Sequence, residues 1–173
     1  MKQQTGKPMI KKICMLVCSL MITAGSLSAQ VISELPPFER AIAVIKHFEG
    51  LHNKAEHYPY VGYGHKVLPG ENLSMDMTEE EADRLLRSDL MKLCKMFSGY
   101  GQDSLLLATL AYNVGAYRLL GYDDRPKSRL IQMLDEGDRN IYREYITFRK
   151  YKGKVIPSLE LRRRMEFELL YIP

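Results

Sequence analysis

The feature that most limits the fold is residues 105–112, where almost every side chain is apolar. A helix with apolar side chains all round has to be surrounded by other elements of the protein. We therefore expect this segment to be the buried central helix of one helical core. Asp103 or Ser104 is its expected N-cap, and residues 113–115, which include a glycine, are its expected end.

Amphipathic helices are expected around this centre. Apolar residues recur at helical spacing over residues 38–48 and again over 82–97. Thr78 and Glu81 have the spacing of a capping box, which places the start of the second of these helices directly after Thr78. Before the first, Pro36 and Pro37 are expected to exclude helix. Three further helices are expected over residues 126–136, 140–147 and 158–170.

The β-structure is expected in one short region. Residues 57–67 are rich in Tyr, Gly, Pro and His, and this composition predicts short strands and turns. We expect strands only between residues 55 and 75, because nearly everything after residue 77 has a helical pattern. The predicted fold class is α+β, mostly α, with a small β-hairpin lobe beside a larger helical lobe.

Residues 1–29 have the pattern of a signal peptide. Lysines precede an apolar run over residues 13–24, and small residues follow it. The run is shorter than the ~20 residues of a membrane-spanning helix, although an uncleaved N-terminal anchor is the alternative. We expect residues 30–173 to form a single domain in the periplasm or outside the cell, without stable membrane association once the leader is removed.

Charge and composition argue against a nucleic-acid-binding protein and against a metal or cofactor site. The formal net charge is +4, but four lysines belong to residues 1–29, so the remainder carries 21 basic and 21 acidic residues. A nucleic-acid-binding protein should keep a strong basic excess. We expect no metal and no cofactor, because the histidines lack partner cysteines and HExxH spacing. The four histidines are His47, His52, His57 and His65. Cys94, the remaining cysteine, should be a small buried side chain.

The charge is unevenly distributed after the leader. Residues 30–104 carry 12 acidic and 8 basic residues, whereas residues 105–173 carry 9 acidic and 13 basic residues. We interpret the basic excess as a solvated helical face, with attraction to an anionic polymer as the alternative. The residues that dominate it are Lys150, Lys152, Lys154, Arg162, Arg163 and Arg164.

One acid stands out by its position. Glu49 ends the first helix, follows Phe48 and precedes Gly50 and the β-region. The negative end of the helix dipole and burial against aromatic side chains both disfavour a charged carboxylate. We therefore expect Glu49 to stay protonated near neutral pH, where it could donate a proton to the leaving oxygen of a glycosidic bond.

Four motifs with a characteristic spacing include this acid. They are residues 48–50 (FEG) followed by 61–65 (VGYGH), residues 78–82 (TEEEA), residues 110–115 (LAYNVG) and residues 148–164. Together they resemble the phage-type lysozymes, or endolysins, of glycoside hydrolase family 24 in the lysozyme-like superfamily, over residues 38–171. The resemblance implies a lysozyme-like fold and an exported muramidase whose partner is the peptidoglycan glycan strand. The bond it implies is the β-1,4 bond between N-acetylmuramic acid and N-acetylglucosamine.

The resemblance also implies roles for individual residues. Glu49 takes the general-acid position, and His65 pairs with Asp89 as a structural ion pair between the lobes. The residues expected to contact substrate are Tyr60, Tyr112 and Asn113. Gly62 and Gly64 are expected to allow close backbone approach in the hairpin.

The sequence departs from the family at the second catalytic acid. Where family members carry an acid, usually Asp, this chain has Tyr58, and their threonine before the Gly-Tyr-Gly-His motif is replaced by Tyr60. Glu56 is the only acid between Glu49 and Glu71, so Glu56 or His57 is the candidate substitute.

Three mechanisms follow from this departure. In the first, Glu49 protonates the leaving oxygen while Glu56 or His57, across a gap of ~6.5–9.5 Å, activates a water molecule. The configuration at the anomeric carbon is then inverted. In the second, Glu49 acts alone and the N-acetyl or 6-hydroxyl group of the substrate is the nucleophile, as in lytic transglycosylases. In the third, the protein only binds peptidoglycan, for example within an envelope-spanning apparatus. We expect an active enzyme.

Overall fold

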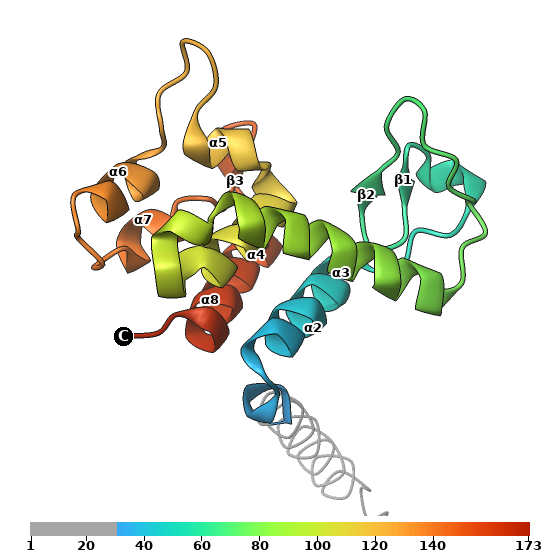
Figure 1. Ribbon diagram of the computed structural model, residues 1–173, viewed down its shortest axis with the longest axis horizontal. Coiled ribbons are helices and arrows are strands. Elements are labelled where there is room, and N and C mark those ends of the chain that lie inside the picture. The colour runs from blue at the N-terminus through green and yellow to red at the C-terminus, as the bar shows by residue number, and fades with distance from the viewer. Residues whose placement is uncertain (1–30) are drawn as a thin grey trace, which may run out of the picture. The chain divides into compact units, whose positions relative to one another are not determined.

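The part of the chain that this computed structural model describes, residues 31–173, is built mainly from helices (Figure 1). The predicted signal peptide, residues 1–29, lies outside the described residues. Pro36–Pro173 form one unit, separate from Met1–Leu35, and the fold below is that of Pro36–Pro173. In the described part of the chain, none of the helices has both the length and the apolar character that crossing a membrane requires.

The elements of this unit follow in chain order, with the labels of Figure 1. The α-helices are α2 (Pro37–Glu49), α3 (Glu79–Met96), α4 (Ser104–Val114), α5 (Ala116–Leu120), α6 (Arg129–Asp135), α7 (Tyr142–Ile146) and α8 (Pro157–Leu170). Short 3-10 helices cover Ala55–His57 and Ser98–Asp103. The strands form two antiparallel hairpins, β1 (Tyr60–Val61) with β2 (His65–Lys66) and β3 (Lys150–Tyr151) with β4 (Lys154–Val155). The predicted α+β, mostly helical fold class is confirmed.

The predicted central helix is α4, and its side chains from Leu106 to Ala111 are all buried. It packs against α2, α3 and α8, so the apolar circumference is covered as expected. Asp103 occupies the N-cap position, but its side chain does not cap the helix. Its carboxylate instead accepts hydrogen bonds from Nε and Nη2 of Arg139, both at 2.9 Å, because a buried carboxylate needs a charged partner.

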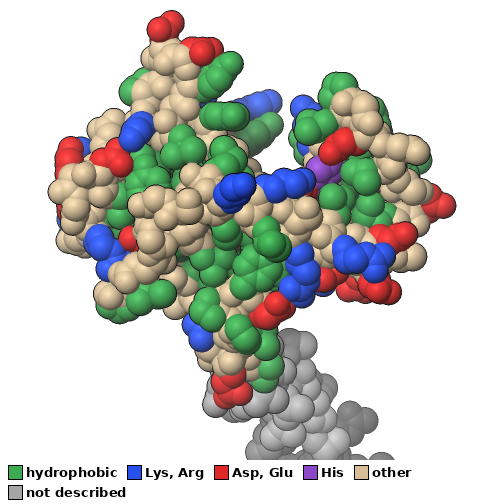
Figure 2. Space-filling model, viewed as in Figure 1, with side chains coloured by type: hydrophobic (Ala, Val, Ile, Leu, Met, Phe, Trp, Pro, Cys, Tyr) green, Lys and Arg blue, Asp and Glu red, His purple; other side chains and the backbone are tan. Residues whose placement is uncertain are grey.

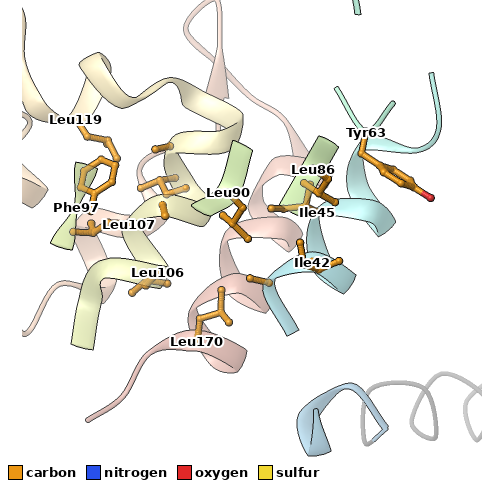
Figure 3. Close-up of a cluster of buried hydrophobic side chains, with 14 of the residues drawn as sticks. Ile42, Ile45, Tyr63, Leu86, Leu90, Phe97, Leu106, Leu107, Leu119 and Leu170 are labelled. Carbon is orange, nitrogen blue, oxygen red and sulfur yellow. The ribbon is translucent and has the colours of Figure 1, made fainter. Parts of the chain in front are cut away.

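Figure 3 shows how the core is assembled from segments far apart in the chain. Each fully buried leucine or isoleucine in such a core stabilises the fold by ~1.5–3 kcal/mol relative to an exposed one. The labelled residues are Ile42, Ile45, Tyr63, Leu86, Leu90, Phe97, Leu106, Leu107, Leu119 and Leu170. Because they come from α2, α3, the residue directly after α3, α4, α5, α8 and the β1–β2 hairpin, this core fixes the hairpin and the helices to one another.

The helix starts follow local sequence rules with one correction. At α3, the Thr78 hydroxyl accepts from the Glu81 N–H, and the Glu81 carboxylate accepts from the Thr78 N–H, which confirms the capping box. At α2, Pro37 occupies the first turn, where no N–H is needed. The prediction that the prolines exclude helix before them is wrong, since residues 31–34 are helical. The prolines end that helix instead, because the residue before a proline avoids helical angles.

The prediction that strands occur only between residues 55 and 75 is also wrong. The β3–β4 hairpin turns through Lys152 and Gly153, which both have positive φ angles, +48° and +78°. Its strands contain only two residues each, too few to show an alternating apolar pattern. Helix α5 was not predicted, and α6 begins at Arg129, later than expected, because Ser128 caps it.

Candidate active site

Glu49 lies at the last position of α2, where Gly50 ends the helix with a φ of +69°. One carboxylate oxygen, Oε1, accepts a hydrogen bond from Nη1 of Arg162 on α8 at 2.6 Å. The other, Oε2, faces the β1–β2 hairpin, since a Cβ atom at Gly64 would lie 3.4 Å from it. The side chain keeps 20% of its exposure. Glu49 is therefore anchored through one oxygen and touches both the hairpin and the helical part of the fold.

A buried charged cluster on α8 lies behind Glu49. The carboxylate of Glu166 accepts a hydrogen bond from Nε of Arg162 at 2.8 Å and another from the hydroxyl of Tyr145 at 2.8 Å. Nη1 of Arg163 lies 3.0 Å from the same carboxylate, an ion pair without hydrogen-bond alignment. Arg162, Arg163 and Glu166 are all buried. The cluster therefore depends on mutual neutralisation, because unpaired charges are costly inside a protein.

The cluster sets the electrostatics around Glu49. Burial lowers the pKa of Arg162, but the carboxylates of Glu166 and Glu49 outweigh burial and leave the pKa raised. For Arg163 burial dominates, and its pKa is lowered. Arg162 therefore connects Glu166 in the buried cluster to Oε1 of Glu49.

Tyr112 and Asn113, two of the expected substrate contacts, lie beside this cluster. The Tyr112 hydroxyl donates to the backbone carbonyl of Tyr63 in the hairpin at 2.8 Å. Burial, and after it the neighbouring carboxylates, Glu49 among them, raise the pKa of Tyr112. The Asn113 side-chain oxygen accepts from Nη2 of Arg163 at 2.9 Å. Because both polar groups already form hydrogen bonds within the protein, Tyr112 connects α4 to the hairpin and Asn113 connects α4 to α8.

The surface is hollowed between the part that carries β1 and β2 and the part that carries the later helices (Figure 2). Glu49 touches residues from both parts, through Gly64 and Arg162. Binding sites form preferentially where two parts of a fold meet, so the surface around Glu49 at this junction is the candidate active site.

Comparison with known proteins decides the family. The sequence model of the Phage lysozyme family matches residues 46–166, more than half of the chain. The chain belongs to the phage lysozyme family. Among solved structures, the muramidase domain of SpmX from Asticaccaulis excentricus is similar, with a TM-score of 0.57 and 24% identity over 78% of this chain and 96% of that one. At this identity the likeness shows the fold. No curated protein matches.

In this phage lysozyme family member, His65 lies between two carboxylates. Its Nδ1 is 2.5 Å from Oδ2 of Asp89 on α3, the expected pair, and its Nε2 is 2.9 Å from Oε2 of Glu71, which the sequence did not indicate. Burial lowers the pKa of His65, but the hydrogen bonds to Glu71 and Asp89 outweigh it and leave the pKa raised. Gly62 packs close to α3, because a Cβ atom there would lie 3.3 Å from Cβ of Ala82.

The candidates for the second catalytic group lie on the hairpin's 3-10 helix. The Glu56 side chain is 73% exposed and lies 4.0 Å from Nε2 of His57. Nδ1 of His57 accepts from the Lys54 N–H at 3.3 Å, and its ring lies 4.9 Å from the His52 ring. Among the described residues, neither Glu56 nor His57 forms a hydrogen bond or ion pair with Glu49. No contact within residues 31–173 therefore connects either candidate to the carboxyl group of Glu49.

Within residues 31–173, Tyr58 and Tyr60 also form no hydrogen bond with Glu49. Tyr58, where the family's second acid would be, is exposed. Tyr60, the third expected substrate contact, is exposed, and its ring lies 6.4 Å from the ring of His52. Its position leaves it open to ligand, whereas Tyr112 and Asn113 are held by protein contacts.

Sequence reasoning missed the roles of three α8 residues in this family member. Arg162 and Arg163 were interpreted as part of a solvated face, and this interpretation is wrong because both are buried against Glu166. The sequence nevertheless contained an indication that these arginines are buried. Three consecutive helical residues spread over about 200° of the helix circumference, so Arg162, Arg163 and Arg164 cannot all face water on a packed helix. Glu166 stands at the i+4 and i+3 positions that pair with the first two.

Proposed function

We propose that this protein is an exported muramidase that cleaves the β-1,4 bond between N-acetylmuramic acid and N-acetylglucosamine, with Glu49 as general acid. The observation that carries the proposal is the placement of Glu49 in a member of the phage lysozyme family. One oxygen is anchored to Arg162, the other faces Gly64, and the side chain remains open to solvent at the lobe junction.

The two oxygens of Glu49 have different tasks in this proposal. Oε1 is occupied by the Arg162 guanidinium, so the transferable proton belongs on Oε2. As the glycosidic C–O bond breaks, the proton passes from Oε2 to the leaving oxygen, and Glu49 becomes a carboxylate paired with Arg162. A guanidinium stabilises a carboxylate more than an acid, so this contact favours the charge that develops in the transition state.

The second group comes from the substrate in this proposal. Glu56 is largely exposed, and no described contact orients it toward Glu49. His57 is poorly suited to act as a base, because Nδ1 accepts the Lys54 N–H and the ring proton of the neutral form then resides on Nε2. We therefore place Glu49 as the only catalytic side chain, with an oxygen of the sugar itself attacking the anomeric carbon.

Two substrate oxygens could attack, and their products differ. Attack by the 6-hydroxyl returns its proton to the Glu49 carboxylate and gives an anhydro-sugar. Attack by the N-acetyl oxygen gives a cyclic cation that water opens to a reducing end. The test is to incubate the purified protein with peptidoglycan sacculi and analyse the released muropeptides by mass.

Matched variants test the single-acid mechanism in the same assay. Glu49→Gln should lose release by about 10²–10⁴-fold, the usual contribution of general acid catalysis. Glu56→Gln and His57→Ala should both retain release within a few-fold of the wild type. If either loses activity as severely as Glu49→Gln, a second protein group takes part and the proposed mechanism is wrong.

The rival function is a protein that binds peptidoglycan without cleaving it, for example in an envelope-spanning apparatus. The absence of an acid at position 58 is the observation that favours it. Co-sedimentation of the wild-type protein with sacculi, with no muropeptide released, would support this rival and contradict the muramidase.

We also propose that residues 1–29 are removed on export, leaving residues 30–173 as one lysozyme-like domain that acts outside the cytoplasm. The support is the lysine-rich start and the apolar run of the leader. Mass spectrometry of the protein from the cell envelope or medium should find a mature N-terminus near Ala29 or Gln30. An intact residue 1 in that fraction would contradict removal.

A further inference from the structure

The ring of His65 on β2 lies between two carboxylates, of which only Asp89 was expected. Asp89 on α3 faces Nδ1 at 2.5 Å, and Glu71, from the turn after β2, faces Nε2 at 2.9 Å. The His65 side chain keeps only 10% of its exposure. Burial lowers the pKa of His65, but the hydrogen bonds to Glu71 and Asp89 outweigh burial and leave the pKa raised. Both ring nitrogens therefore contact a hydrogen-bond acceptor.

Only the charged form of the ring can satisfy two acceptors. A neutral imidazole carries one N–H group, whereas a protonated imidazole carries two. Glu71 is ionised near neutral pH, because the hydrogen bond from His65, and after it the N–H of Leu68, lower its pKa. Its carboxylate therefore has no proton to donate. When His65 loses its proton, one ring nitrogen has to point a lone pair at a carboxylate.

Glu71 is the less firmly held of the two partners. Asp89 keeps a second cation, since Nζ of Lys92 lies 3.2 Å from its Oδ1, and its side chain is only 15% exposed. The Glu71 side chain is 34% exposed, and within residues 31–173 its one ion-pair partner is His65. The remaining proton of a neutral His65 therefore belongs on Nδ1, toward Asp89, and the contact with Glu71 is the one that is lost.

The other elements around the ring supply no substitute for this contact. On α4, the nearest titratable group is Tyr112, whose pKa is raised by burial and then by the Asp89 carboxylate. Strand β1 contributes only the exposed phenol of Tyr60. On β2 itself, Lys66 points to the opposite face of the strand from His65.

Glu71 also closes the turn that follows β2. The oxygen that faces His65, Oε2, accepts the Leu68 N–H at 2.8 Å as well. The Glu71 N–H in turn donates to the Leu68 carbonyl at 3.1 Å. The Glu71 side chain thus connects the turn over residues 68–71 to the ring of His65.

This turn is connected to the candidate active site through β2. His65 directly follows Gly64, and a Cβ atom at Gly64 would lie 3.4 Å from Oε2 of Glu49. The strand that Glu71 holds through His65 therefore begins directly after the residue that faces the proposed proton-donating oxygen.

We propose that Glu71 is a proton-controlled latch on the hairpin beside Glu49. While His65 is protonated, the latch holds the turn over residues 68–71 to β2 and fixes the hairpin; when His65 loses its proton, the turn is released. This inference adds control of the active site by pH, and its link to activity rests on the proposed function.

The latch is tested by NMR on the purified protein, with the His65 ring signals giving the titration midpoint and amide exchange giving the protection of Leu68. Leu68 protection should fall about tenfold as pH rises through this midpoint, because its acceptor is released. The Val67 amide should keep its protection, since it donates to the Pro59 carbonyl within the hairpin at 2.9 Å. No step at Leu68, or an equal step at Val67, would overturn the inference.

A charge-removing variant tests whether Glu71 sets the step. Glu71→Gln keeps the size and one acceptor oxygen of the side chain, so the His65 midpoint should fall by about one pH unit and the Leu68 step should move down with it. Glu80→Gln is the matched control, because Glu80 is an exposed carboxylate that pairs with Arg84 and, within residues 31–173, not with His65. An unmoved Leu68 step in Glu71→Gln, or an equal shift in Glu80→Gln, would overturn the inference.

Muropeptide release separates the latch from the proposed function. The ratio of the release rates of Glu71→Gln and wild type cancels the titration of Glu49, which both proteins share. The ratio should be near one at about pH 5.5, below the ordinary pKa of histidine, and should fall about threefold between the two His65 midpoints, where a loosened hairpin misplaces the substrate. A ratio that is constant with pH would overturn the control of the site. The predicted NMR steps without any release would support the latch and contradict the muramidase.

Discussion

Replacement of Glu166 by glutamine tests whether the cluster behind Glu49 is a buried ion network. Glu166 is fully buried and neutralises Arg162 and Arg163, which are buried too. Glutamine keeps the size of the side chain but removes its charge, leaving two guanidinium groups without that partner. Breaking a buried ion pair from one side costs ~3–5 kcal/mol. For a domain of this size the loss corresponds to a fall in melting temperature of about 10–15 °C.

A second glutamate on α8 provides the matched control. Glu160 also accepts from two arginines, Arg149 and Arg164, but its side chain keeps 25% of its exposure. Partly exposed pairs contribute only ~0–1 kcal/mol. Urea denaturation of both variants at pH 7, followed by circular dichroism, should therefore show a large loss for Glu166→Gln and a small one for Glu160→Gln. Equal losses would refute the argument that burial makes the Glu166 network critical.

Three further predictions concern the hairpin. Gly64→Ala should reduce muropeptide release more than Gly70→Ala. Both glycines have φ near +90°, so both substitutions strain the backbone, but of the two added Cβ atoms only the one at Gly64 would contact Glu49. Urea denaturation measures the destabilisation that both variants share, so a further loss of release by Gly64→Ala is assigned to the contact with Glu49. Tyr112→Phe should destabilise the fold by ~1 kcal/mol in urea, since it removes one hydrogen bond to the hairpin, and unchanged stability would contradict that contact. The raised pKa of His65 means that its charge stabilises the fold fully below its ordinary pKa of about 6.5 and that this is lost as pH rises through the raised value. The stability difference between wild type and His65→Gln should therefore shrink from pH 6 to pH 9 in urea titrations, and a constant difference would contradict the ion pair.

What the sequence predicted well depends on local rules. The buried α4 helix followed from its apolar circumference, and the start of α3 followed from the spacing of Thr78 and Glu81. The place of Glu49 at the end of α2 followed from the apolar pattern before it and from Gly50 directly after it. Each of these features is decided within a few residues, where periodicity and capping act.

What the sequence did not predict depends on contacts between distant segments. Arg162 binds Glu49 across 113 positions of the chain, and no local pattern announces such a pair. The β3–β4 hairpin is too short for an alternation to show. Asp103 left its expected capping role because Arg139, distant in sequence, is its partner in the fold.

The central claim is that Glu49 delivers the proton that breaks the glycosidic bond. The most direct measurement compares the initial rate of muropeptide release by wild-type protein and by Glu49→Gln, with folding checked by circular dichroism and binding by co-sedimentation. The account predicts that Glu49→Gln still folds and binds sacculi but releases muropeptides at least about 10²-fold more slowly. Release at the wild-type rate by the folded variant would contradict it.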